Sequence, residues 1–100
     1  MTTAAITTVA AARATANAWV LDHLPDRFAA GVPTYDAPRH GWRVPVWLAY
    51  PHVAPLGPVG ELWVDAQQGA VTAHPTLVEM KERAWKLYEH HRAQIDAPLL

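Results

Sequence analysis

Residues 42–71 read WRVPVWLAYPHVAPLGPVGELWVDAQQGAV, and this stretch decides the fold. Two runs in it, Trp42–Tyr50 and Val59–Ala66, alternate between apolar and other side chains as β-strands do. The second run leads through the turn sequence Asp65-Ala66-Gln67-Gln68-Gly69 into a short third run, Ala70–Ala73. Because strands joined by short connections pair antiparallel, we predict an antiparallel meander here.

Helical patterns flank this stretch on both sides. Thr3–Leu24 is rich in alanine and free of glycine and proline, and Pro25 ends it. One face of that helix is expected to carry Ala5, Val9, Ala12, Ala16, Trp19 and Val20. Thr76 and Glu79 form a capping-box pattern that predicts the start of a second helix. Its apolar stripe would comprise Leu77, Met80, Ala84, Leu87, Tyr88, His91 and Ile95.

The segment between the first helix and residue 42 is divided by prolines and glycines. We expect one short edge strand there, Val32–Ala37, followed by a turn. Pro45 lacks an amide hydrogen, so we expect it at an edge position or a bulge. The predicted fold is therefore α+β in a single domain, residues 1–100. An N-terminal helix precedes three or four antiparallel strands, a C-terminal helix follows, and both helices cover one sheet face.

Composition excludes several functional classes. The formal net charge is −1 and the charges are mixed along the chain, so we expect no binding to nucleic acid or to an anionic membrane. The absence of cysteine and of serine excludes thiolate and serine nucleophiles and cysteine-ligated metals. No apolar run is long enough to span a membrane and no signal peptide is recognisable, which predicts a soluble, cytoplasmic protein.

Six histidines invite a metal hypothesis, but their spacing does not support one. His90 and His91 are adjacent on a predicted helix and diverge by about 100°, so they cannot chelate one ion as an (i, i+4) pair would. The other histidines, which are expected near the ends of elements, are His23, His40, His52 and His74. We also expect the Asp65 carboxylate to bond the backbone of its own turn. No convergent catalytic site emerges, and we expect neither enzymatic activity nor a cofactor.

The aromatic residues of the two long strands point to a surface. If Trp42, Val44 and Val46 face the helices, Trp47 and Trp63 lie on the opposite face, together with Arg43 and Glu61. Exposed tryptophans beside charged residues are typical of interface hot spots. Two structural alternatives stay open. A bulge at Pro45 would turn Trp47 inward, or the loop Pro51–Pro58 would fold over both rings.

The run VGELWVDAQQGAV, residues 59–71, resembles the PepSY-type domains, small modules of peptidase propeptides and related bacterial proteins. In that family a strand ends in an aspartate and turns through a glycine into the next strand, and Asp65 and Gly69 occupy those places here. The resemblance implies a non-catalytic binding or inhibitory module and names no partner.

The sequence as a whole predicts a non-catalytic protein-interaction module. It would be a homodimer, or an accessory or inhibitory subunit of another protein, using Trp47, Trp63, Arg43 and Glu61 as its contact surface. The alternative is a small-molecule or metal-binding protein, or a minor hydrolase, that uses histidines near the strand ends. Metal analysis of protein purified without a histidine tag separates the metal form of this alternative from the interaction module.

Overall fold

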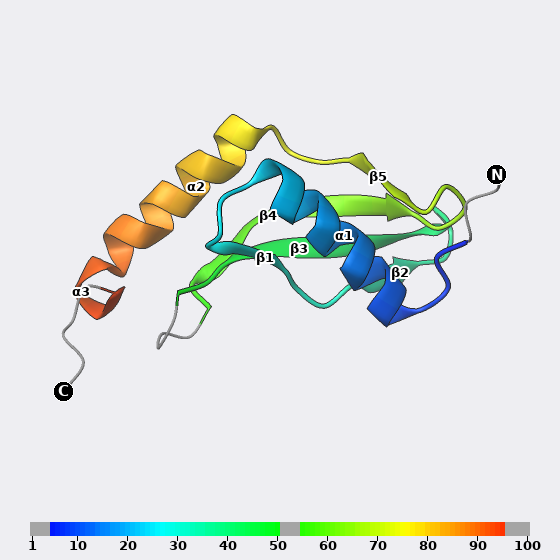
Figure 1. Ribbon diagram of the computed structural model, residues 1–100, viewed down its shortest axis with the longest axis horizontal. Helices are drawn as coiled ribbons and strands as arrows, with labels where there is room; N and C mark the ends of the chain where they lie inside the picture. Colours follow the sequence, from blue (N-terminus) through cyan, green and yellow to red (C-terminus); the bar gives the residue numbers. More distant parts are fainter. Residues whose placement is uncertain (1–4, 51–54, 96–100) are drawn as a thin grey trace.

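The computed structural model describes residues 5–50 and 55–95 and has the predicted α+β architecture (Figure 1). Its helices and strands are α1 (Val9–His23), β1 (Phe28–Ala30), β2 (Thr34–Asp36), β3 (Gly41–Leu48), β4 (Gly57–Asp65), β5 (Ala70–Ala73), α2 (Leu77–His90) and α3 (Arg92–Ile95). The strands form one antiparallel sheet in the order β1-β3-β4-β5, and β2 also pairs with β3. No helix of the described part of the chain is long and apolar enough to cross a membrane.

One edge of β3 is shared by two short strands, and Pro45 lies where they meet. β1 pairs with residues 46–48 of β3, and β2 pairs with residues 41–43. The Gly31 amide donates to the Pro45 carbonyl at 2.8 Å, at the junction of the two short strands. In an antiparallel ladder the N–H and C=O of one residue point to the same side, so the hydrogen that proline lacks would have pointed at this junction. The expectation of an edge position or bulge at Pro45 is therefore wrong: β3 is central, and its proline lies at a gap between partners.

The segment before β3 contains two strands where one was expected. The predicted strand Val32–Ala37 is confirmed only over Thr34–Asp36, and Phe28–Ala30 forms a further three-residue strand. Side chains of α1 bond the backbone of β1. The Ala30 amide donates to Asn17 Oδ1 at 3.2 Å, and Arg13 Nε donates to the Ala30 carbonyl at 3.2 Å. These bonds cover an edge that would otherwise expose unpaired backbone groups.

A bulge in β4 turns Val59 to the helix side of the sheet. Val46 pairs with Gly60 but Trp47 pairs with Pro58, so Val59 is the extra residue. An extra residue reverses the alternation of side chains along a strand. Val59 is consequently fully buried, although simple alternation places it on the outer side with Glu61.

Helix α1 begins later than predicted. Thr8 is its N-cap, with the Oγ1 atom accepting from the Ala11 amide at 3.1 Å. Of the predicted apolar face, Ala12, Ala16 and Val20 are fully buried, Trp19 is partly buried, and Val9 is 48% exposed. Ala5 precedes the helix and is exposed. Its neighbour Ile6 instead joins the sheet end, where its amide donates to the Ala66 carbonyl and its carbonyl accepts from the Trp42 indole.

Helix α2 begins as the capping box predicts, with Thr76 Oγ1 accepting from the Glu79 amide at 3.1 Å. It ends at His90, and α3 follows as a separate turn. Met80 packs against Gly60, where a Cβ atom would lie 3.2 Å from Met80 Cγ. Gly60 is the register partner of Val46, whose side chain is in the core, so α2 lies on the same face of the sheet as α1.

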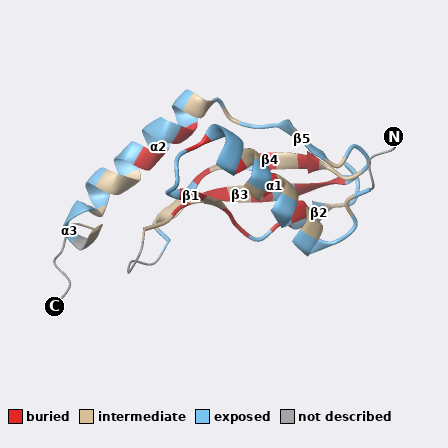
Figure 2. Cartoon of the chain, viewed as in Figure 1, coloured by how far each residue is buried: buried red, intermediate tan, exposed pale blue. Residues whose placement is uncertain are grey.

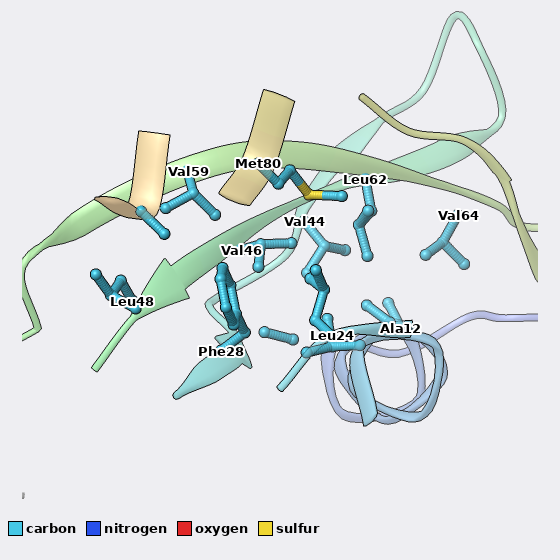
Figure 3. Close-up of a cluster of buried hydrophobic side chains, with 14 of the residues drawn as sticks. Ala12, Leu24, Phe28, Val44, Val46, Leu48, Val59, Leu62, Val64 and Met80 are labelled. Atoms are coloured by element: carbon cyan, nitrogen blue, oxygen red, sulfur yellow. The ribbon is translucent and has the colours of Figure 1, made fainter. Parts of the chain in front are cut away.

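The core lies between these two helices and the sheet. Figure 3 shows Met80 of α2 in one cluster with Ala12 of α1 and Val44, Val46 and Leu62 of the central strands. Within the described ranges, the buried side chains are all apolar. Figure 2 shows this burial concentrated in the central strands, while α2 projects past the end of the sheet with an exposed outer side.

Candidate functional site: the outer face of the sheet

The outer face, defined here as the sheet face opposite α1 and α2, carries all four residues singled out from the sequence. The buried side chains of β3 are Trp42, Val44, Val46 and Leu48, so the intervening positions face away from the helices. Trp47 therefore stays on the outer face, because the bulge lies in β4 and does not turn this residue of β3 inward. The other alternative, coverage by the loop Pro51–Pro58, falls largely outside the described residues.

The four residues occupy three successive outward-facing rows of the β3–β4 ladder, which alternate with the inward-facing rows of Val44 and Val46. Arg43 is directly opposite Trp63, Glu61 is opposite Pro45 in the next row, and Trp47 is opposite Pro58. At ~3.3 Å per residue and ~4.8 Å between strands, the Cα atoms of Trp47 and Trp63 lie roughly 14 Å apart. The structure thus places Arg43 beside Trp63 and Glu61 between the two indoles, rather than gathering all four side chains at one point.

Trp63 is held in place by a glycine and an arginine. The indole lies so close to Gly41 that a Cβ atom there would overlap it. Arg39, from the turn between β2 and β3, places its Cζ atom 5.4 Å from the ring centroid, within cation–π range. Trp63 remains partly exposed, so its orientation is set while part of the ring still faces solvent.

Trp47 packs closely against a glycine at the other end. A Cβ atom on Gly31 would overlap its indole and come within 2.9 Å of Pro45 Cγ. The Trp47 side chain is also partly exposed. Both tryptophans therefore present restrained aromatic surface, and a restrained side chain loses little conformational entropy when a partner covers it.

A hollow of about 530 Å³ opens beside Trp63. Its lining includes Arg43 and Glu61 from the strands, and also Arg39 and His74, which the sequence did not single out. Arg39 comes from a turn and His74 from the connection between β5 and α2, so only the folded chain brings them to Trp63. Trp47 does not line this hollow. Indole surface, guanidinium donors and a carboxylate together make an aromatic and polar contact surface.

Four of the histidines, His23, His74, His90 and His91, make contacts with the backbone or with neighbouring rings. The Nδ1 atoms of His23, His74 and His91 lie 2.8, 2.6 and 2.9 Å from the carbonyl oxygens of Trp19, Pro75 and Leu87. The rings of His90 and His91 meet edge to face at 5.7 Å. His52 lies outside the described residues, and within the described ones no three metal-type side chains come together.

The acidic turn after β4 is built as expected. Asp65 Oδ1 accepts from the amides of Gln67 and Gln68 at 3.0 and 2.8 Å, and Gly69 adopts a left-handed conformation with φ of 66°.

The chain matches no protein-family model, no curated protein and no solved structure. The PepSY-type resemblance of residues 59–71 therefore stays a prediction.

Proposed function

We propose that this protein is a non-catalytic interaction module, acting in the cytoplasm, that binds a protein partner through the outer face. One observation carries the proposal. Trp47 and Trp63 are restrained but partly exposed on the face that neither α1 nor α2 covers, with Arg43 beside Trp63 and Glu61 between the two indoles. Partly exposed aromatic anchors with flanking charges are the common anatomy of protein–protein interfaces.

A second copy of the chain is the partner that this pattern fits best. Arg43 and Glu61 lie on neighbouring strands, in adjacent outward-facing rows, and carry opposite charges. A two-fold axis between them would bring each Arg43 to the Glu61 of the other copy, and would leave each indole facing the other sheet. If the same four side chains bind a different protein, the chain acts as an accessory or inhibitory subunit of that protein.

The size of the outer face predicts weak association. Eight residues of β3 span ~26 Å and four strand widths span ~19 Å, which gives about 500 Å² per copy in projection. Twice this area falls below the ~1,200 Å² of standard stable interfaces. We therefore expect reversible dimers, with dissociation constants on the order of micromolar or weaker.

Sedimentation equilibrium over a wide range of protein concentrations tests the proposal. The wild-type chain should dimerise, and the double variant Trp47→Ala/Trp63→Ala should not, while its circular dichroism spectrum stays native. Arg43→Glu and Glu61→Arg should each weaken the dimer, and the double charge swap should restore it. Trp85→Ala, which removes an exposed indole from α2, is the matched control and should dimerise normally.

Two results would overturn the dimer. One is a wild-type chain that stays monomeric at every concentration, and the other is dimerisation that none of the outer-face substitutions changes. Unfolding of the double tryptophan variant would assign those rings to the core, and the charge-swap series, which leaves the tryptophans in place, would then decide. The accessory-subunit form requires a purified partner whose binding Trp47→Ala/Trp63→Ala abolishes and Trp85→Ala does not.

A further inference from the structure

A second surface, on the opposite side of the sheet from the outer face, lies between α2, the start of β1 and the end of β3. We call it the aromatic groove. It has a volume of about 470 Å³, within the usual range of small-molecule sites. Phe28 and Leu48, both nearly fully buried, form its apolar base, and Ala84 of α2 leaves room above them. Because Phe28 and Leu48 are core residues, the groove opens on the helix side of the sheet.

A row of rings forms the walls of the aromatic groove. Trp85 and Tyr88 of α2 stack with centroids 5.7 Å apart and planes inclined by 28°. Tyr88 meets Tyr50 at 6.1 Å, and Arg27 lies over Tyr50 with its Cζ atom 5.1 Å from the centroid. Trp85 ends the row and is 61% exposed. Such exposure is unusual for a tryptophan on a helix that packs against the core.

The charge around these rings has one sign. Arg27, Lys81 and Arg92 line the aromatic groove, and no acidic side chain among the described residues does. The chain as a whole carries a net charge of −1, so this local excess of cations is not a consequence of composition. Aromatic walls alone would also attract cations, but the positive side chains of Arg27 and Lys81 at the same place repel them.

We propose that the aromatic groove binds a small aromatic carboxylate. The flat apolar body would stack against Trp85 and Tyr88 over the base formed by Phe28 and Leu48. Its carboxylate would meet Arg27 and Lys81, since a guanidinium or ammonium group bonds a carboxylate more strongly than a neutral donor does. This site shares no residue with the outer face, so it stands or falls separately from the proposed interaction function.

Fluorescence titration with 8-anilinonaphthalene-1-sulfonate tests the site, because this probe joins aromatic rings to a sulfonate that stands in for the carboxylate. We expect saturable binding of one probe per chain and displacement by 2-naphthoate. Lys81→Glu and Trp85→Ala should each raise the dissociation constant at least tenfold. Both side chains are exposed, so both variants should keep the wild-type thermal transition. The neutral analogue N-phenyl-1-naphthylamine should bind at least tenfold more weakly than the sulfonate.

Matched controls distinguish binding at this site from non-specific binding of the probe. Lys86→Glu makes the same charge change on the same helix outside the aromatic groove, and should change the dissociation constant less than twofold. Trp63→Ala, on the outer face, should also leave probe binding unchanged. The proposal fails if binding does not saturate, if Lys86→Glu weakens it as much as Lys81→Glu does, or if the neutral analogue binds as well as the sulfonate.

Discussion

His40 and Gly69 occupy the same position in two hairpins of similar design. Each is the fourth residue after an aspartate that ends a strand, Asp36 in one hairpin and Asp65 in the other. Each adopts the left-handed conformation, with φ of 53° for His40 and 66° for Gly69. The two turns are also joined directly, because the Ala66 amide donates to the His40 carbonyl at 3.1 Å. The hairpin after Asp65 thus has glycine, the residue type that the left-handed conformation favours, whereas the hairpin after Asp36 has a histidine there.

His40→Gly should raise the free energy of unfolding by about 0.5–1 kcal/mol, since a side chain at positive φ is strained and glycine is not. Gly69→Ala should lower it by ~1–2 kcal/mol for the same reason. Urea denaturation followed by tryptophan fluorescence measures both. If His40→Gly destabilises the protein, the imidazole makes a contact that stabilises the turn by more than the strain costs. The two turns would then share a backbone conformation but not its energetic cost.

Asp65→Ala should cost about 1 kcal/mol, because the Asp65 carboxylate accepts from two turn amides in the folded chain. Asp65→Asn retains an acceptor oxygen and should cost less than half as much. Asp36→Ala is the matched comparison, since Asp36 accepts from a single amide at the longer distance of 3.3 Å. Equal losses for Asp65→Ala and Asp36→Ala in urea denaturation would show that these bonds do not set the stability of the turns.

Gly31→Ala should cost roughly 1–3 kcal/mol, because the added methyl group would collide with the Trp47 indole. The same substitution in a Trp47→Ala background should cost less, since the closest clashes are gone and only the approach to Pro45 Cγ at 2.9 Å remains. A double-mutant cycle of thermal unfolding measures this coupling. A cost that is the same in both backgrounds would place the strain in the backbone of residue 31 or in its contact with Pro45, and not in its contact with Trp47.

Met80→Ala should lower the free energy of unfolding by ~2–4 kcal/mol, because it empties a fully buried position between α2 and β4. Val78→Ala on the same helix is the control, with a side chain 65% exposed and an expected effect below ~0.5 kcal/mol. Chemical denaturation compares them. Similar effects of the two substitutions would mean that α2 is not anchored through Met80.

Local patterns predicted the elements that local chemistry determines. The capping residue Thr76 and the inward face of β3 followed from spacing alone. β1 could not be predicted in this way, because three residues between prolines have no periodicity and become a strand only by pairing with residues 46–48. The burial of Val59 depends on a bulge, and a bulge is set by the register of two strands rather than by either sequence.

The candidate site shows the same division. Arg43, Trp47, Glu61 and Trp63 were assigned to one face because alternation within a strand is local. Arg39 and His74 line the hollow beside Trp63 from a turn and a connection, so no spacing in the sequence pointed to them. The aromatic groove combines the end of β3, the start of β1 and one side of α2, and only the packing of α2 on the sheet brings these together.

The gap at Pro45 has a consequence for how the domain opens. β1 is tied to α1 through Asn17 and Arg13, whereas β2 is tied to β3 through a short hairpin. Because a single amide, that of Gly31, bridges the junction at Pro45, the two halves of this sheet edge can separate from β3 independently. Native-state hydrogen exchange should therefore resolve two opening units, with the amides of β1 exchanging together with those of α1 and the amides of β2 following their own, more local fluctuation.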